Sequence, residues 1–204
     1  MRDIKTWLWL LLFGSLWGVC EVIAGEDLFG KGVPHASVWL SAWALFVLAM
    51  ARGVLNKPGS STAVGTFAAI FKLVNAAPFF CHLLGIFFLA LAFDVFSSIL
   101  MKRESKVLIR TSLGGALSAY SGNALFALIM AYVVRYKYWT AGGLSKVLHH
   151  IFISGSLAAL MAIAAVPLGY WTGVYGMALA KRRPGWAYTG ALIALLFLWT
   201  MGRI

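Results

Sequence analysis

Long apolar segments recur along the whole chain, separated by only short polar stretches. A helix of about 20 apolar residues crosses the hydrocarbon core of a bilayer, where its backbone groups must bond to one another. We expect seven spans, at Thr6–Ala24, His35–Val54, Thr62–Ala77, Phe79–Met101, Arg110–Val134, His149–Ala180 and Trp186–Gly202. The pattern predicts an all-α fold, a polytopic transmembrane bundle of six to seven helices, as one integral membrane domain over residues 1–204.

The composition argues against a soluble domain. Hydrophobic residues make up 62% of the chain and charged residues 11%, against roughly 45–50% and about 25% in soluble proteins. The formal net charge of +11 is carried by short clusters of cations between the apolar segments. This distribution is typical of the loops of membrane proteins. We therefore expect the chain to interact with the lipid bilayer and not with nucleic acid.

The basic residues also predict an orientation. With the amino terminus inside, five lie on the outer side and eleven in the inner loops, namely Arg2, Lys5, Arg52, Lys57, Lys102, Arg103, Lys106, Arg110, Lys181, Arg182 and Arg183. Cytoplasmic loops are enriched in Lys and Arg, so this bias favours an inside amino terminus and an outside carboxyl terminus. We expect the location to be a bacterial inner membrane.

Three ionisable residues, Glu21, Lys72 and Asp94, lie deep within apolar segments. Such groups are costly in lipid, so each should face the bundle interior and find a partner. Similar depth predicts that Glu21 pairs with Lys72, whereas Asp94 lies near the inner basic loops. The Glu21–Lys72 pair is consistent with two roles, an ion pair that fixes helix register and a substrate or proton site.

We take Glu21, Lys72 and Asp94 as candidate substrate-binding residues, and other polar and aromatic residues extend this candidate site. Asn75 follows Lys72 by three residues and therefore lies on the same helix face. Asn123 adds a second amide, and Trp17 offers a flat apolar wall. A mostly apolar cavity with a few convergent polar groups is the usual form of a small-molecule site.

Four histidines, His35, His82, His149 and His150, each open a span at the predicted outer face. Imidazoles at common depth could ligate a transition metal, or bind an anion when protonated. A haem would need a facing pair, for which His82 with His149 or His150 is the candidate. A third interpretation is that histidine is simply tolerated at the membrane interface. No cofactor is predicted from these residues.

Enzyme signatures are missing from the sequence. The chain contains no GxSxG, P-loop or HExxH motif. We therefore expect a protein that is not an enzyme, and one whose energy source, if it transports against a gradient, is an ion or a partner.

Two stretches carry a family resemblance. The segment from Gly14 to Glu21, GSLWGVCE, resembles the first helix of the substrate-binding (S) components of energy-coupling factor (ECF) transporters. The stretch FKLVNAAP from Phe71, followed by an apolar helix containing Asp94, is similar to their third and fourth helices. The resemblance covers roughly residues 6 to 135. The family typically has six spans, where seven are predicted here, and no substrate-specific motif is clear.

The resemblance implies a helical bundle that binds a vitamin, metal or other micronutrient near its outer face. It also implies a transmembrane coupling subunit and two ATPases as partners, with Gly14 and Gly18 matching the small residues that dock the coupling subunit. The alternatives are an accessory or structural subunit of a larger membrane complex, such as a respiratory one, and a metal or haem protein that uses the outer histidines.

Overall fold

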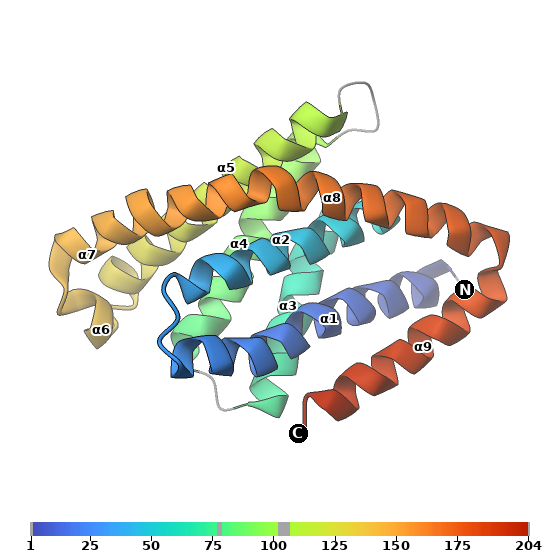
Figure 1. The fold of residues 1–204 in the computed structure, drawn as a ribbon, viewed down its shortest axis with the longest axis horizontal. Helices are drawn as coiled ribbons and strands as arrows, with labels where there is room; N and C mark the ends of the chain where they lie inside the picture. Colours follow the sequence, from blue (N-terminus) through green and yellow to red (C-terminus); the bar gives the residue numbers. More distant parts are fainter. Residues whose placement is uncertain (1, 77–78, 102–106, 204) are drawn as a thin grey trace.

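The computed structural model describes residues 2–76, 79–101 and 107–203, which form helices joined by short turns (Figure 1). Its α-helices are α1 (Arg2–Gly30), α2 (Ala36–Leu55), α3 (Ser60–Asn75), α4 (Phe80–Leu100), α5 (Val107–Leu128), α6 (Lys137–Thr140), α7 (Gly143–His149), α8 (Gly155–Arg182) and α9 (Pro184–Met201). Two π-helical turns, η1 (Ile129–Val133) and η2 (His150–Ser154), continue α5 and precede α8. The predicted all-α fold is confirmed.

Six helical stretches in the described residues are long and apolar enough to cross a membrane. They are Ile4–Gly30, Ala36–Leu55, Phe80–Leu100, Val107–Val133, Gly143–Arg182 and Pro184–Met201. The third predicted span is the exception, because α3 has only 16 residues and a length of about 24 Å. The described residues therefore contain six long apolar spans, which agrees with the predicted bundle of six to seven helices and is one fewer than the seven segments expected.

Helix α3 nevertheless runs alongside α1 and in the same direction. Gly14 of α1 faces Phe67 of α3, and Gly18, one turn later, faces Phe71. A Cβ atom placed on Gly18 would lie 2.7 Å from the Cβ of Phe71, so only glycine allows this approach. This internal contact argues against the expectation that Gly14 and Gly18 dock a coupling subunit, because both glycines are buried against α3.

Helices α2 and α8 form the second close contact. Gly169 lies against the carbonyl of Phe46, and Gly173 against that of Met50, so these two helices also run parallel. Antiparallel α5 packs on α8, where the Ser112 hydroxyl donates to the carbonyl of Ile163 at 3.0 Å. Small residues thus hold the central helices together by backbone proximity, as is typical of helices in lipid.

Helix α9 packs along α1 at the edge of the bundle (Figure 1). The Trp199 indole donates to the hydroxyl of Ser15 at 3.0 Å, and Lys5 lies over the ring of Tyr188. These contacts make α1 and α9 parallel, so the carboxyl end of α9 lies beside the middle of α1, near Ser15, and not beside its amino-terminal end. Ala191 is the one residue of this helix classed as buried.

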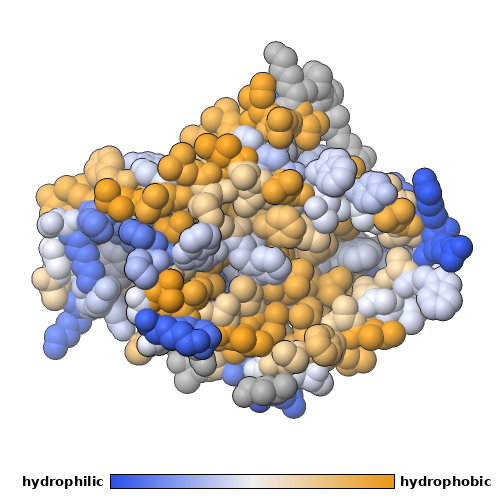
Figure 2. All heavy atoms as spheres, viewed as in Figure 1, coloured by the Kyte–Doolittle hydropathy of each residue, from blue (hydrophilic) through white to orange (hydrophobic). Residues whose placement is uncertain are grey.

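The outer surface is apolar over its middle. Figure 2 shows mostly hydrophobic atoms across the centre of the visible face, with hydrophilic atoms gathered toward its left and right ends. Large hydrophobic side chains such as Leu160, Leu168, Leu196 and Phe197 are exposed on α8 and α9. A water-soluble protein rarely exposes such continuous apolar area, whereas a bilayer covers it.

Candidate ligand-binding cavity

A cavity of about 590 Å³ lies at the end of the bundle away from the amino terminus. Its walls come from the second half of α1, the first turns of α2 and α4, the end of α5, and the segment from α6 to η2. The sequence places these segments far apart, but alternating helix direction brings them to one end. Residues of the predicted substrate-binding site and three of the four predicted outer histidines line this one cavity.

The deep wall contains Glu21, held by two donors. The Trp17 indole nitrogen, one helical turn earlier, donates to Glu21 Oε1 at 3.2 Å. Lys72 of α3 donates from Nζ to Glu21 Oε2 at 2.9 Å. The side chains of Lys72 and Glu21 are 5% and 10% exposed, so this is a buried ion pair. The predicted pairing is confirmed, and Trp17 and Glu21 both line the cavity while Lys72 lies behind the wall.

The two asparagines are placed differently. Asn123 of α5 lines the cavity, and its amide nitrogen donates to the carbonyl of Ala119 at 2.8 Å. Asn75 donates to the carbonyl of Phe71 at 2.8 Å and packs near Gly202, outside the lining of the cavity. The structure therefore brings Trp17, Glu21 and Asn123 to the cavity and leaves Asn75 with Lys72 behind it.

His82 belongs to an aromatic cluster on one side of the cavity. Its ring stacks on Phe29 with centroids 5.4 Å apart and meets Phe79 edge-on at 5.9 Å. All three residues line the cavity. This contact explains how the carboxyl end of α1 meets the start of α4, and it gives the cavity a flat wall.

His150 belongs to a second aromatic cluster in the cavity lining. Its ring meets Trp139 edge-on at 5.1 Å and Phe126 at 5.9 Å. His150 begins the π-helical turn η2, and His149 precedes it at the exposed rim of the cavity. A π-turn re-aims side chains relative to an α-helix and frequently occurs at functional sites.

His35 lies apart from the other histidines. It is exposed at the start of α2, with a left-handed backbone (φ 56°), and does not line the cavity. Among the described residues, no three His, Cys, Asp or Glu side chains gather closely enough to hold a metal ion. The four histidines predicted at the outer face are therefore divided: His82, His149 and His150 line the cavity, and His35 lies outside it.

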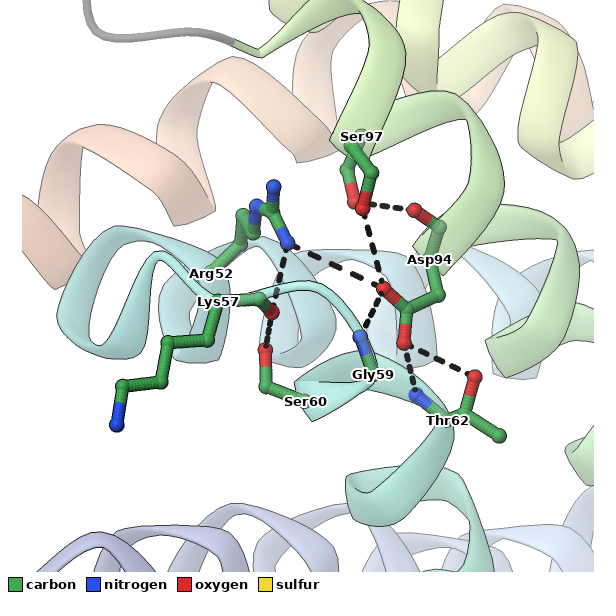
Figure 3. Close-up of polar contacts among 8 residues, drawn as sticks. Arg52, Lys57, Gly59, Ser60, Thr62, Asp94 and Ser97 are labelled. Atoms are coloured by element: carbon green, nitrogen blue, oxygen red, sulfur yellow. Dashed lines mark hydrogen bonds and ion pairs between the residues drawn. The ribbon is translucent and has the colours of Figure 1, made fainter.

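Asp94 lies at the other end of the bundle, where it caps helix α3 (Figure 3). Its Oδ1 accepts from the backbone nitrogen of Gly59, and its Oδ2 accepts from the backbone nitrogen and the hydroxyl of Thr62, all at 2.9 Å. The Arg52 guanidinium lies 3.9 Å from Oδ1 and donates to the carbonyl of Lys57 at 2.8 Å. Asp94 thus contacts the basic loop between α2 and α3, as the sequence predicted.

The capping geometry has a local cause. Gly59 precedes α3 with a left-handed backbone (φ 82°) and has no side chain to cap the helix. A capping residue normally accepts from the third helical N–H, here that of Thr62. Asp94 supplies this acceptor from α4, so its carboxylate is committed to the helix start. It does not line the cavity, which corrects the prediction that Asp94 belongs to the substrate-binding site.

Several lining residues were not singled out from the sequence. Ser37 and Ser41 of α2, Cys81 of α4 and Lys146 of α7 all line the cavity. Ser37 and Ser41 are four residues apart and therefore lie on the same face of α2. This spacing could have identified them as candidate lining residues from the sequence. Lys146 gave no such signal, because only the fold of α6 and α7 brings it over the cavity rim.

No known protein family, curated protein sequence or solved structure matches the chain. Fold and surface define its class, which is that of a helical, polytopic integral membrane protein with six candidate spans in the part of the chain that the structure describes.

Proposed function

We propose that this chain is the membrane-embedded, small-molecule-binding subunit of an ECF-type transporter, with a micronutrient as its substrate. The observation that carries the proposal is the cavity between α1, α2, α4 and α5, with aromatic walls and the buried carboxylate of Glu21. It is not proposed to be an enzyme.

The size and lining of the cavity support binding of one small molecule. Ligand pockets typically enclose about 300–1,000 Å³ and combine apolar walls with a few placed polar groups. Here the aromatic clusters around His82 and His150 supply flat surfaces, and Glu21 and Asn123 supply fixed acceptors and donors. A buried ion pair costs free energy of desolvation, and a binding role is one reason for a chain to retain it.

Energy for transport would come from partners, which we propose to be a coupling subunit and two ATPases. Because Gly14 and Gly18 pack against α3, docking would use another surface, and the exposed apolar helices α8 and α9 supply one. The proposed orientation has the amino terminus in the cytoplasm of a bacterium. The cavity would then open toward the outside, where a micronutrient is captured.

The test begins with native purification and mass spectrometry of copurifying small molecules. Occupancy is then measured by maleimide labelling, because Cys81 lines the cavity and Cys20 does not. In Cys20→Ala protein the bound molecule is expected to protect Cys81. In Cys81→Ala protein, the matched control, it should leave the labelling of Cys20 unchanged.

Other outcomes of this purification would replace the proposal. A visible absorption band together with bound iron would indicate haem between His82 and His149 or His150. A stable stoichiometric complex that contains no small molecule would indicate an accessory or structural subunit. Labelling of Cys81 that no copurified molecule alters would remove the cavity as the binding site.

A further inference from the structure

The two ends of the cavity differ in charge. The only acid among the described lining residues is Glu21, which lies in the deep wall. The rim, defined here as Tyr138, Lys146 and His149, contains a cation and an exposed imidazole. Lys146 and His149 are three residues apart on α7 and therefore lie on one helix face.

Glu21 has acceptor positions left over. A carboxylate accepts about four hydrogen bonds, and the protein supplies two, from Trp17 and Lys72. Because Lys72 already balances its charge, the wall does not attract a cation by net charge. It offers acceptor positions, which suit the N–H donors of an uncharged ring.

Lys146 also has capacity to spare. Its Nζ donates to the backbone carbonyl of Tyr138 at 3.0 Å and lies 2.9 Å from the centre of the Tyr138 aromatic ring. An ammonium group carries three donors, so this geometry fixes Lys146 at the rim while leaving it able to bind an anion. Unlike Lys72, it has no carboxylate partner among the described residues.

We propose that the ligand is a flat heteroaromatic acid, with ring N–H donors facing Glu21 and an anionic group held at the rim by Lys146 and His149. This inference rests on the proposed function and specifies its substrate class. The aromatic clusters of Phe29 with His82 and of Phe126 with Trp139 flank the space between the two ends, where the ring would lie.

Three probes separate the two polar contacts. Pterin-6-carboxylate carries both an N–H edge and an acid, pterin lacks the acid, and 2-naphthoate lacks the N–H edge. Each is titrated against Cys20→Ala protein in detergent, with protection of Cys81 from maleimide as the readout. Pterin-6-carboxylate is expected to bind about tenfold or more tightly than either truncated probe, since each lost contact involves a charged or buried polar group.

Variants assign each contact to its residue. In the Glu21→Gln variant, pterin-6-carboxylate is expected to bind no more tightly than 2-naphthoate. In the Lys146→Gln variant, it is expected to bind no more tightly than pterin. The matched control is Lys31→Gln, which removes an exposed cation outside the cavity lining, paired with Asp27, and should preserve both advantages. If Glu21→Gln protein does not fold, the double variant Glu21→Gln/Lys72→Met replaces it, because that variant leaves no unpaired buried charge.

The outcomes distinguish this inference from the function on which it rests. Tighter binding of pterin than of pterin-6-carboxylate overturns the inference and leaves a ligand-binding cavity. The same holds if a copurified molecule protects Cys81 while none of the three probes does. If neither the probes nor any copurified molecule protects Cys81, both proposals fail.

Discussion

The carboxylate of Glu21 and the ammonium of Lys72 lie 2.9 Å apart inside the bundle, although 51 residues separate them in the chain. The pair links α1 to α3 across the same interface that Gly18 and Phe71 keep tight. Both side chains are 90% or more buried, so each charge depends on the other for its stability. Helix packing and the candidate site are therefore coupled through one interaction.

Replacing one residue of this pair is expected to lower the free energy of unfolding more than replacing both. Lys72→Met leaves the Glu21 charge buried with one donor, Trp17, and should lower the free energy of unfolding by about 3–5 kcal/mol. Glu21→Gln/Lys72→Met should recover most of that loss because no unpaired charge remains. Thermal unfolding in detergent measures both. A double variant less stable than Lys72→Met would contradict this account.

Asp94 is expected to act on stability alone. Asp94→Ala removes the acceptor for the backbone of Gly59 and Thr62, and loss of a helix cap costs about 0.5–2 kcal/mol. It also leaves the buried Arg52 guanidinium without its carboxylate, so the free energy of unfolding should fall by more than the cap alone accounts for. Binding in the cavity should not change, because Asp94 does not line it. Ser98→Ala, which removes only a 3.4 Å contact with Asp94, is the control and should be close to neutral. If the Asp94→Ala protein is fully folded but binds ligand more weakly, Asp94 takes part in ligand binding and this account is wrong.

Gly18 and Gly176 provide a matched pair of substitutions. A Cβ atom at Gly18 meets the side chain of Phe71 at 2.7–2.8 Å, whereas one at Gly176 meets nothing within 4 Å. Gly18→Ala should destabilise the protein by about 1–3 kcal/mol through overpacking. Gly176→Ala should be neutral or slightly stabilising, because alanine favours the helix. The midpoints of thermal unfolding compare the two, and equal effects would show that the α1–α3 contact is looser than described.

The parallel course of α1 and α9 predicts that the two termini lie on opposite sides of the membrane. Reporter domains that are active on only one side, fused in turn to each terminus, should give opposite results. The short helix α3 is the reason, since it reverses the chain between α2 and α4 although it is not among the six long spans. Equal reporter results at both termini would show that α3 does not cross.

Much of the architecture could be predicted from composition and pattern. Apolar segments of spanning length predicted helices close to α1, α2, α4, α5, α8 and α9, because a backbone in lipid has no other way to satisfy its polar groups. The pairing of Glu21 with Lys72 also followed from their depths. The ends of helices and the short helices α6 and α7 were not predicted, since they depend on turns and on side-chain contacts between distant segments.

Local properties of the sequence are enough to predict apolar helices with a few buried charges that must find partners, because both follow from the transfer free energies of single segments. Which partners these charges find depends on the tertiary structure. It assigned Asp94 to the start of α3, Gly14 and Gly18 to internal packing, and three of the four histidines to the cavity that holds Glu21. These outcomes depend on how the helices pack, which is a property of contacts between segments and not of any one segment.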